Sequence, residues 1–150
     1  YEKFDNYGVT FEYPADYIIE EKIIEEDHYF KVYLNKDDDT MYREVQIDWI
    51  NNPIKYDPIN GRKESGKRLA DYYGSKVKTL KNYETYLNEE KVFWADYVLD
   101  EDGIQIFLKS GITRIGDYVF VLQKISDIDD EDEEANKILK SIRVTRNKAE

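Results

Sequence analysis

The sequence predicts an α+β domain: an antiparallel sheet of about seven or eight strands, in the order ββββ-α-ββββ-α, with two helices packed on it. Three observations lead to this prediction. Short apolar runs alternate with polar residues, which is the period of a half-buried strand. Two other segments show the three-to-four-residue spacing of an amphipathic helix. Turn residues separate the runs, and no strand–helix–strand rhythm of a parallel sheet is present.

Four strands are expected in the first third of the chain. Residues 7–13 alternate until Pro14, which cannot donate to a strand ladder. Residues 17–25 are rich in isoleucine and form the second candidate. The third strand has an apolar face made by Phe30, Val32 and Leu34. In the fourth strand, the inward face is expected to hold Val45, Ile47 and Trp49, and the outward face Glu44, Gln46 and Asp48.

The first helix is expected at residues 63–78, after a segment of turn residues at 51–62. Helical spacing is shown by the apolar residues Leu69, Tyr72, Tyr73, Val77 and Leu80. Glycine disfavours a helix interior, so Gly74 is also a candidate for an earlier end of this helix.

The second half returns to strands, at residues 83–87, 91–99, 104–114 and 118–125. Asp102-Gly103 is a strong hairpin signal between two of them, and Gly116-Asp117 predicts a second tight turn. These features predict a meander of neighbouring antiparallel strands.

The chain closes with a second predicted helix, capped by Asp127 or Asp129. Acidic residues at 130–134 suit the positive end of its dipole. Its apolar stripe is formed by Ala135, Ile138, Leu139 and Ile142. With one stripe each, both helices are expected to cover the same face of the sheet. We expect one domain at residues 1–144 and a frayed tail at 145–150.

Charge limits the classes of partner. The formal net charge is −11, so a polyanion such as a nucleic acid is not expected as a ligand. Residues 62–81 depart from this balance with a local charge of +5, from Arg62, Lys63, Lys67, Arg68, Lys76, Lys78 and Lys81 against Glu64 and Asp71. This run has two interpretations: a solvated helix face, or a docking stripe for an acidic partner or anionic headgroup.

No catalytic or cofactor motif is found. The chain has no cysteine, no nucleophile elbow and no phosphate-binding glycine loop, and we expect no cofactor. Its one histidine, His28, is read as a turn residue rather than a general base. With 33 acidic residues, a carboxylate-based hydrolase is only a distant alternative, because close carboxylates arise by chance.

Two acidic clusters are candidates for calcium sites, because calcium binds dense oxygen ligands. Residues 37–39 are three aspartates in a loop, and residues 127–132 begin like an EF-hand loop. In the second cluster, Asp132 stands where that loop needs glycine, and Ile138 where it needs glutamate. A solvated hairpin tip and a helix cap are the preferred interpretations, and no metal is predicted.

Aromatic residues are the strongest hint of binding. There are 14 tyrosines, a residue favoured at interfaces because its ring is rigid and its tip polar. Tyr29, Lys31 and Tyr33 are expected on the face opposite the apolar one of their strand. We expect a partner at this patch, or at the basic residues Arg62, Lys63, Lys67 and Arg68.

Over nearly its whole length the chain resembles PsbP-like domains, in the order of its elements and at scattered residues. The resemblance begins with the run Tyr7-Gly8-Val9-Thr10-Phe11-Glu12-Tyr13-Pro14-Ala15-Asp16-Tyr17, which is similar to the family's aromatic first strand and its Tyr-Pro-x-x-Trp step. Tyr17 stands in place of that tryptophan. Residues 88–97 resemble the family's central strand, and residues 138–142 (Ile-Leu-Lys-Ser-Ile) its terminal helix.

The superfamily includes photosystem II extrinsic subunits, a nuclear Ran-GTPase release factor and DcrB-type bacterial lipoproteins. The resemblance implies a binding or accessory domain without an established active site. We therefore expect a non-enzymatic domain displayed at a prokaryotic cell surface or secreted, with a lipid tether upstream of Tyr1 and a protein or cell-surface ligand. A cytosolic adaptor that docks on a GTPase through the basic helix is the alternative. No apolar run is long enough to span a bilayer. An edge strand is free in principle to pair with another copy.

Overall fold

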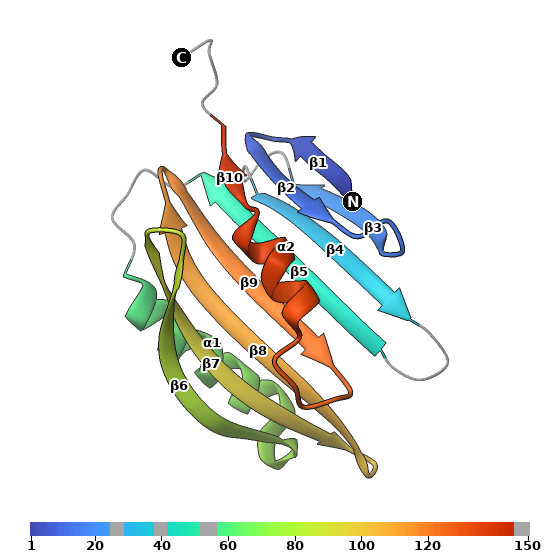
Figure 1. The fold of residues 1–150 in the computed structure, drawn as a ribbon. Helices are drawn as coiled ribbons and strands as arrows, with labels where there is room; N and C mark the ends of the chain where they lie inside the picture. Colours follow the sequence, from blue (N-terminus) through green and yellow to red (C-terminus); the bar gives the residue numbers. More distant parts are fainter. Residues whose placement is uncertain (25–28, 38–41, 52–56, 146–150) are drawn as a thin grey trace.

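The computed structural model describes residues 1–24, 29–37, 42–51 and 57–145. Its strands form two antiparallel sheets, one of seven strands in the order β3-β4-β5-β9-β8-β7-β6 and one of three in the order β1-β2-β10 (Figure 1). The strands are β1 (Glu2–Asn6), β2 (Val9–Tyr13), β3 (Ile18–Ile24), β4 (Tyr29–Asp37), β5 (Tyr42–Asn51), β6 (Val77–Leu87), β7 (Glu90–Glu101), β8 (Ile104–Ile115), β9 (Tyr118–Ser126) and β10 (Arg143–Val144). The helices are α1 (Pro58–Tyr73), the 3₁₀ turn η2 (Gly74–Lys76) and α2 (Glu133–Lys140).

The α+β class is confirmed, and the order ββββ-α-ββββ-α is found within the chain. The strand order differs from the prediction at both ends: β1 precedes the expected strands, β10 follows the last helix, and β2 leaves the main sheet to pair with both. The sequence hides β1 because Phe4 is its single buried residue. That ring stacks on Phe11 at a centroid distance of 4.7 Å and meets Trp49 edge-on.

The two helices lie on opposite faces of the seven-stranded sheet, so the expectation of one shared face is wrong. Figure 1 shows α2 in front of the sheet and α1 behind it. Trp94 and Ala95 are neighbours on β7 and therefore point to opposite faces. Trp94 belongs to the core that α2 covers, and Ala95 to the smaller one against which Leu69 of α1 packs. Both faces of β7 are buried, one in the core that α2 covers and the other in the core that α1 covers.

Helix α1 begins and ends about five residues before the predicted range. Asp57 caps it, accepting a hydrogen bond from the Ile59 N–H at 3.0 Å, and Pro58 occupies the first turn. Gly74, at a φ of 58°, stands at its end, as the alternative prediction had it. Val77 and Leu80, which showed helical spacing with the preceding segment, are part of the long strand β6 instead.

Helix α2 carries three residues of the predicted stripe, Ala135, Ile138 and Leu139, while the buried Ile142 lies just beyond its end. Its cap is Asp132 rather than Asp127 or Asp129. The Asp132 carboxylate accepts from the Ala135 N–H at 3.1 Å. The predicted turn at Asp102-Gly103 is confirmed, because both residues have positive φ and join β7 to β8. Beyond α2, the Thr145 N–H donates to the Gly8 carbonyl at 2.8 Å, and residues 146–150 lie outside the described ranges.

Candidate functional site

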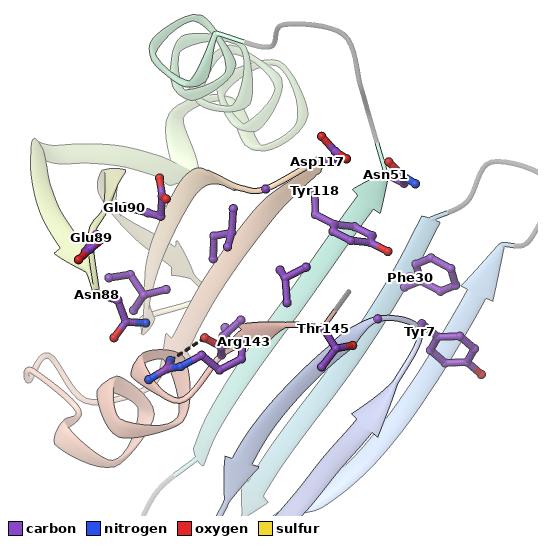
Figure 2. A pocket seen from close by; sticks show the side chains of 16 residues that line it. Tyr7, Phe30, Asn51, Asn88, Glu89, Glu90, Asp117, Tyr118, Arg143 and Thr145 are labelled. Carbon is purple, nitrogen blue, oxygen red and sulfur yellow. Dashed lines mark hydrogen bonds between the residues drawn. The ribbon is translucent and has the colours of Figure 1, made fainter. Parts of the chain in front are cut away.

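A half-open groove of about 1130 Å³ lies at one end of the seven-stranded sheet. Three turns and one short strand surround it: the β1–β2, β6–β7 and β8–β9 turns, and β10 (Figure 2). The β6–β7 and β8–β9 turns lie at the same end of the antiparallel meander β6-β7-β8-β9, and the pairing of β2 with β10 adds the β1–β2 turn and β10 to them. The site is therefore a product of the tertiary fold.

The groove has an apolar floor and a polar rim. The floor is formed by Leu87, Ile115, Tyr118, Ile142 and Val144. Leu87 and Ile142 also belong to the main core. Around the opening stand Asn88, Glu89, Glu90, Asp117 and Arg143 (Figure 2). An apolar floor with a charged rim is typical of binding sites that bury an apolar group of the ligand and select the ligand by polar contacts.

An aromatic wall closes one side of the groove. The Tyr7 ring stacks on Phe30 at 4.8 Å between centroids, and the Tyr7 carbonyl accepts a hydrogen bond from the Trp49 indole at 3.3 Å. Tyr118 lies directly against the backbone of the β1–β2 turn, since a Cβ at Gly8 would come within 2.7 Å of its hydroxyl oxygen. Contacts with the fully buried Trp49 tie this wall to the core, so it presents a fixed surface to a ligand.

The rim is acidic. Glu89, Glu90 and Asp117 are exposed, and among the described residues that line the groove Arg143 is the single basic one. The Arg143 guanidinium already donates to the carbonyls of Lys140 (2.9 Å) and Ile142 (2.8 Å) at the end of α2. The rim therefore favours a ligand with a positive charge beside its apolar group.

The predicted patch of Tyr29, Lys31 and Tyr33 is brought together on β4, away from the groove, although no observation here tests binding by it. The Lys31 ammonium lies 5.9 Å and 5.5 Å from the two ring centroids. It also pairs with the carboxylate of Asp48 on the neighbouring strand at 3.5 Å, and Tyr29 donates its hydroxyl to that carboxylate. All three predicted residues are half-buried.

Asp48 was expected on the outward face of its strand with Glu44 and Gln46, and that face is not solvated at this position, because Tyr29 and Lys31 cover the carboxylate. It is 8% exposed, and its Oδ1 atom has no hydrogen-bond partner. Burial raises the pKa of Asp48, against the lowering effects of Tyr29 and Lys31. The folded chain therefore holds a proton on this carboxyl more tightly than the unfolded chain does. A charged Asp48 consequently opposes folding as the pH rises through its pKa in the folded state.

The four basic residues proposed for docking do not share one environment. Lys63, Lys67 and Arg68 are exposed on α1. Arg62 instead turns toward the sheet, where it donates to the carbonyls of Tyr83 and Trp94 at 3.4 Å and 3.3 Å. It anchors α1 to β6 and β7 and is only partly accessible. Docking at the other three stays a prediction.

Three carboxylates of the second acidic cluster, those of Asp127, Asp130 and Asp132, serve structural hydrogen bonds. Asp127 accepts from the Tyr42 N–H at 3.1 Å, and Asp130 forms a bidentate pair with Arg43 that lowers the pKa of Asp130. Asp132 caps α2. Within the described ranges, no three acidic or histidine side chains are grouped to hold a metal ion. His28, Asp38 and Asp39 lie outside those ranges, and the side chain of Asp37 is not described.

Comparisons with known proteins place the fold. No family model matches the chain, and no curated protein sequence matches it. A crystal structure from Bacteroides thetaiotaomicron aligns over 99% of this chain with a TM-score of 0.60 and 15% identity, and this chain spans about half (49%) of that protein. LpqN, described as involved in cell envelope biogenesis of Mycobacterium tuberculosis, aligns over 92% of this chain and 83% of its own, with a TM-score of 0.54 and 15% identity.

At this identity the likeness shows the fold alone. The fold of this chain is similar to that of LpqN, and the PsbP-like resemblance stays a prediction. None of the described helices is long and apolar enough to cross a bilayer.

Proposed function

We propose that this chain is a binding domain of the prokaryotic cell envelope, that it holds a protein partner at the groove, and that it carries out no catalysis. The groove itself is the observation on which the proposal depends. A volume of about 1130 Å³ is large enough for several side chains of a partner, and its walls are fixed by core residues.

The chemistry of the groove supports recognition of a protein segment. An apolar floor removes a partner's apolar side chain from water, at about 25 cal/mol for each Å² buried. The acidic rim then selects a neighbouring lysine or arginine. Asn88, whose φ is 58°, forms the tight β6–β7 turn that places Glu89 and Glu90 at the opening.

The residues that line the groove also support a role without catalysis. Among those that the structure describes, there is no histidine, cysteine or serine. The carboxylates stand exposed at the rim, where water solvates them well. General acid catalysis near neutral pH instead uses a carboxyl in an apolar environment.

The envelope part of the proposal is supported by the shared fold with LpqN, whose description places that protein in cell envelope biogenesis. A tether upstream of Tyr1 and display at the cell surface are further parts of the same proposal. Fold similarity does not transfer a partner, so the ligand is defined here only by its chemistry: an apolar side chain beside a basic one.

The test is capture of a partner from separated envelope and cytosolic extracts of the cells that make the protein. The immobilised chain is compared with Glu89→Lys/Glu90→Lys at the groove and with Asp100→Lys/Glu101→Lys at the other end of β7. The two variants make the same charge change on exposed residues at or beside the two ends of strand β7. We expect a protein from the envelope extract that the wild type and the control variant retain and the groove variant loses. Equal retention of the partner by all three proteins would refute binding at the groove. Capture of a partner from the cytosolic extract alone would refute the envelope location.

A further inference from the structure

Strand β6 is a long and unusually exposed edge of the seven-stranded sheet. It has eleven residues, and within the described part of the chain it pairs with β7 alone. All but three of its side chains are exposed, including the large apolar ones of Leu80 (49%) and Tyr86 (64%). An edge of this length presents a row of backbone donors and acceptors to which another extended chain can pair.

A bulge arranges two lysines along this edge. Lys78 lies opposite Val98 and Lys81 opposite Asp96, while Leu80 is left out of the register. Val98 and Asp96 are two residues apart, so Lys78 and Lys81 share a face of the sheet. Without the bulge, residues three apart in a strand would point to opposite faces. The bulge therefore places the two lysine side chains on one face, at backbone positions about 7 Å apart along the strand.

The charge of this edge is opposite to that of the chain as a whole. Lys76, Lys78 and Lys81 are exposed, and no acidic residue occurs between Asp71 and Glu84, in a chain of net charge −11. Lys81 is partly engaged, since its Nζ lies 4.0 Å from the Asp96 carboxylate and 5.0 Å from the Tyr83 ring. Its side chain is nevertheless 63% exposed, so it stays accessible to a further carboxylate.

We propose that the edge of β6 binds an extended acidic segment of a partner protein by strand addition. Backbone hydrogen bonds to β6 supply the pairing, and carboxylates at alternate positions of the segment meet Lys78 and Lys81. Leu80 and Tyr86 supply apolar contact. This surface is distinct from the groove, because the two lysines lie toward the start of β6 and the groove rim lies at its other end, from Leu87.

A second copy of the chain is a poorer occupant of the same edge. Antiparallel pairing of two β6 strands about their basic half would bring Lys78 and Lys81 of both copies together. Like charges placed directly across a strand pair are destabilising. Complementary charge therefore favours an acidic segment of a different protein over self-association.

The probe is a fluorescein-labelled peptide of about ten residues, the length of a long strand, with glutamate at every second position and threonine between. Binding to the full chain is followed by fluorescence anisotropy. We expect the peptide to bind, and Lys78→Glu/Lys81→Glu to weaken it at least about tenfold, because two attractive pairs become repulsive. The same peptide with alternate backbone amides N-methylated is expected not to bind, since it cannot complete the ladder.

The matched control is Lys63→Glu/Lys67→Glu, which makes the same charge change on α1 and is expected to bind as the wild type does. Glu89→Lys/Glu90→Lys is also expected to bind normally, which separates this surface from the groove. The proposal is overturned if the N-methylated peptide binds equally well, or if the α1 variant loses as much affinity as the β6 variant. It is also overturned if sedimentation shows a dimer that Lys78→Glu/Lys81→Glu dissociates, because the edge is then covered by a second copy.

Discussion

Gly111 is the position where the packing makes the sharpest prediction about stability. It lies opposite Trp94 in the β7–β8 pair, and the indole ring lies across its backbone. A Cβ added here would come within 2.7 Å of Trp94 Cε3 and 2.8 Å of Val92 Cγ1. The indole has little room to move, because it is 5% exposed and its N–H donates to the Thr85 hydroxyl at 2.8 Å.

Gly111→Ala is therefore expected to destabilise the fold. Overpacking a core costs about 1–3 kcal/mol. Replacing a strand glycine returns roughly 0.5–1 kcal/mol by restricting the unfolded chain. From the middle of the two ranges the net loss is about 1 kcal/mol, which lowers Tm by about 2–4 °C for a chain of this size.

Urea unfolding followed by tryptophan fluorescence measures this loss, with an unchanged m-value as the sign that only stability has changed. The control repeats the substitution in a Trp94→Leu background, where the smaller side chain leaves space for the new methyl group. We expect Gly111→Ala to cost much less there, as contacting residues couple in a double-mutant cycle. An equal loss in both backgrounds would refute the role given to the Trp94 ring.

Three further predictions concern single side chains. Asp132→Ala removes the cap of α2 and a partner of Arg43, and should cost at least about 1 kcal/mol in urea unfolding; no loss would contradict the capping role. Asp48→Asn should raise stability at pH 7, and the gain should vanish below the ordinary carboxyl pKa of 3.8, where Asp48 is protonated; a gain that persists in acid would refute the charge as its cause. Arg62→Met should lower Tm, while Lys63→Met should leave it unchanged, because only Arg62 contacts the sheet; equal effects would contradict that distinction.

The sequence predicts local features of this fold better than its layers. Alternation correctly indicates that Val45, Ile47 and Trp49 face the core, since each is fully buried. The sequence does not predict β1, because Phe4 is its single buried residue and gives no alternating pattern. Phe4 is buried by its contact with Phe11 of another strand. The placement of the helices escapes as well, because an apolar stripe does not say which face of a sheet it covers.

The groove is the part of the site that the sequence could not predict. Its rim comes from turns around Gly8, Asn88 and Gly116, each of which is recognisable as a turn. The predicted meander already sets the turns at Asn88 and Gly116 at one end of the sheet. What adds the Gly8 turn is the pairing of β2 with the two residues of β10, which no local pattern predicts. The patch around Lys31 was predictable for the opposite reason, since residues two apart on one strand share a face.

The central claim is that this chain meets its partner at the groove, in the cell envelope. This claim is tested in living cells with a photo-crosslinking amino acid at one of two positions. One is Glu89, on the groove rim, and the other is Glu101, at the far end of β7. The account predicts a discrete protein adduct from position 89 only, recovered in the envelope fraction. An adduct from position 101 instead, or an adduct and protein confined to the cytosol, would contradict it.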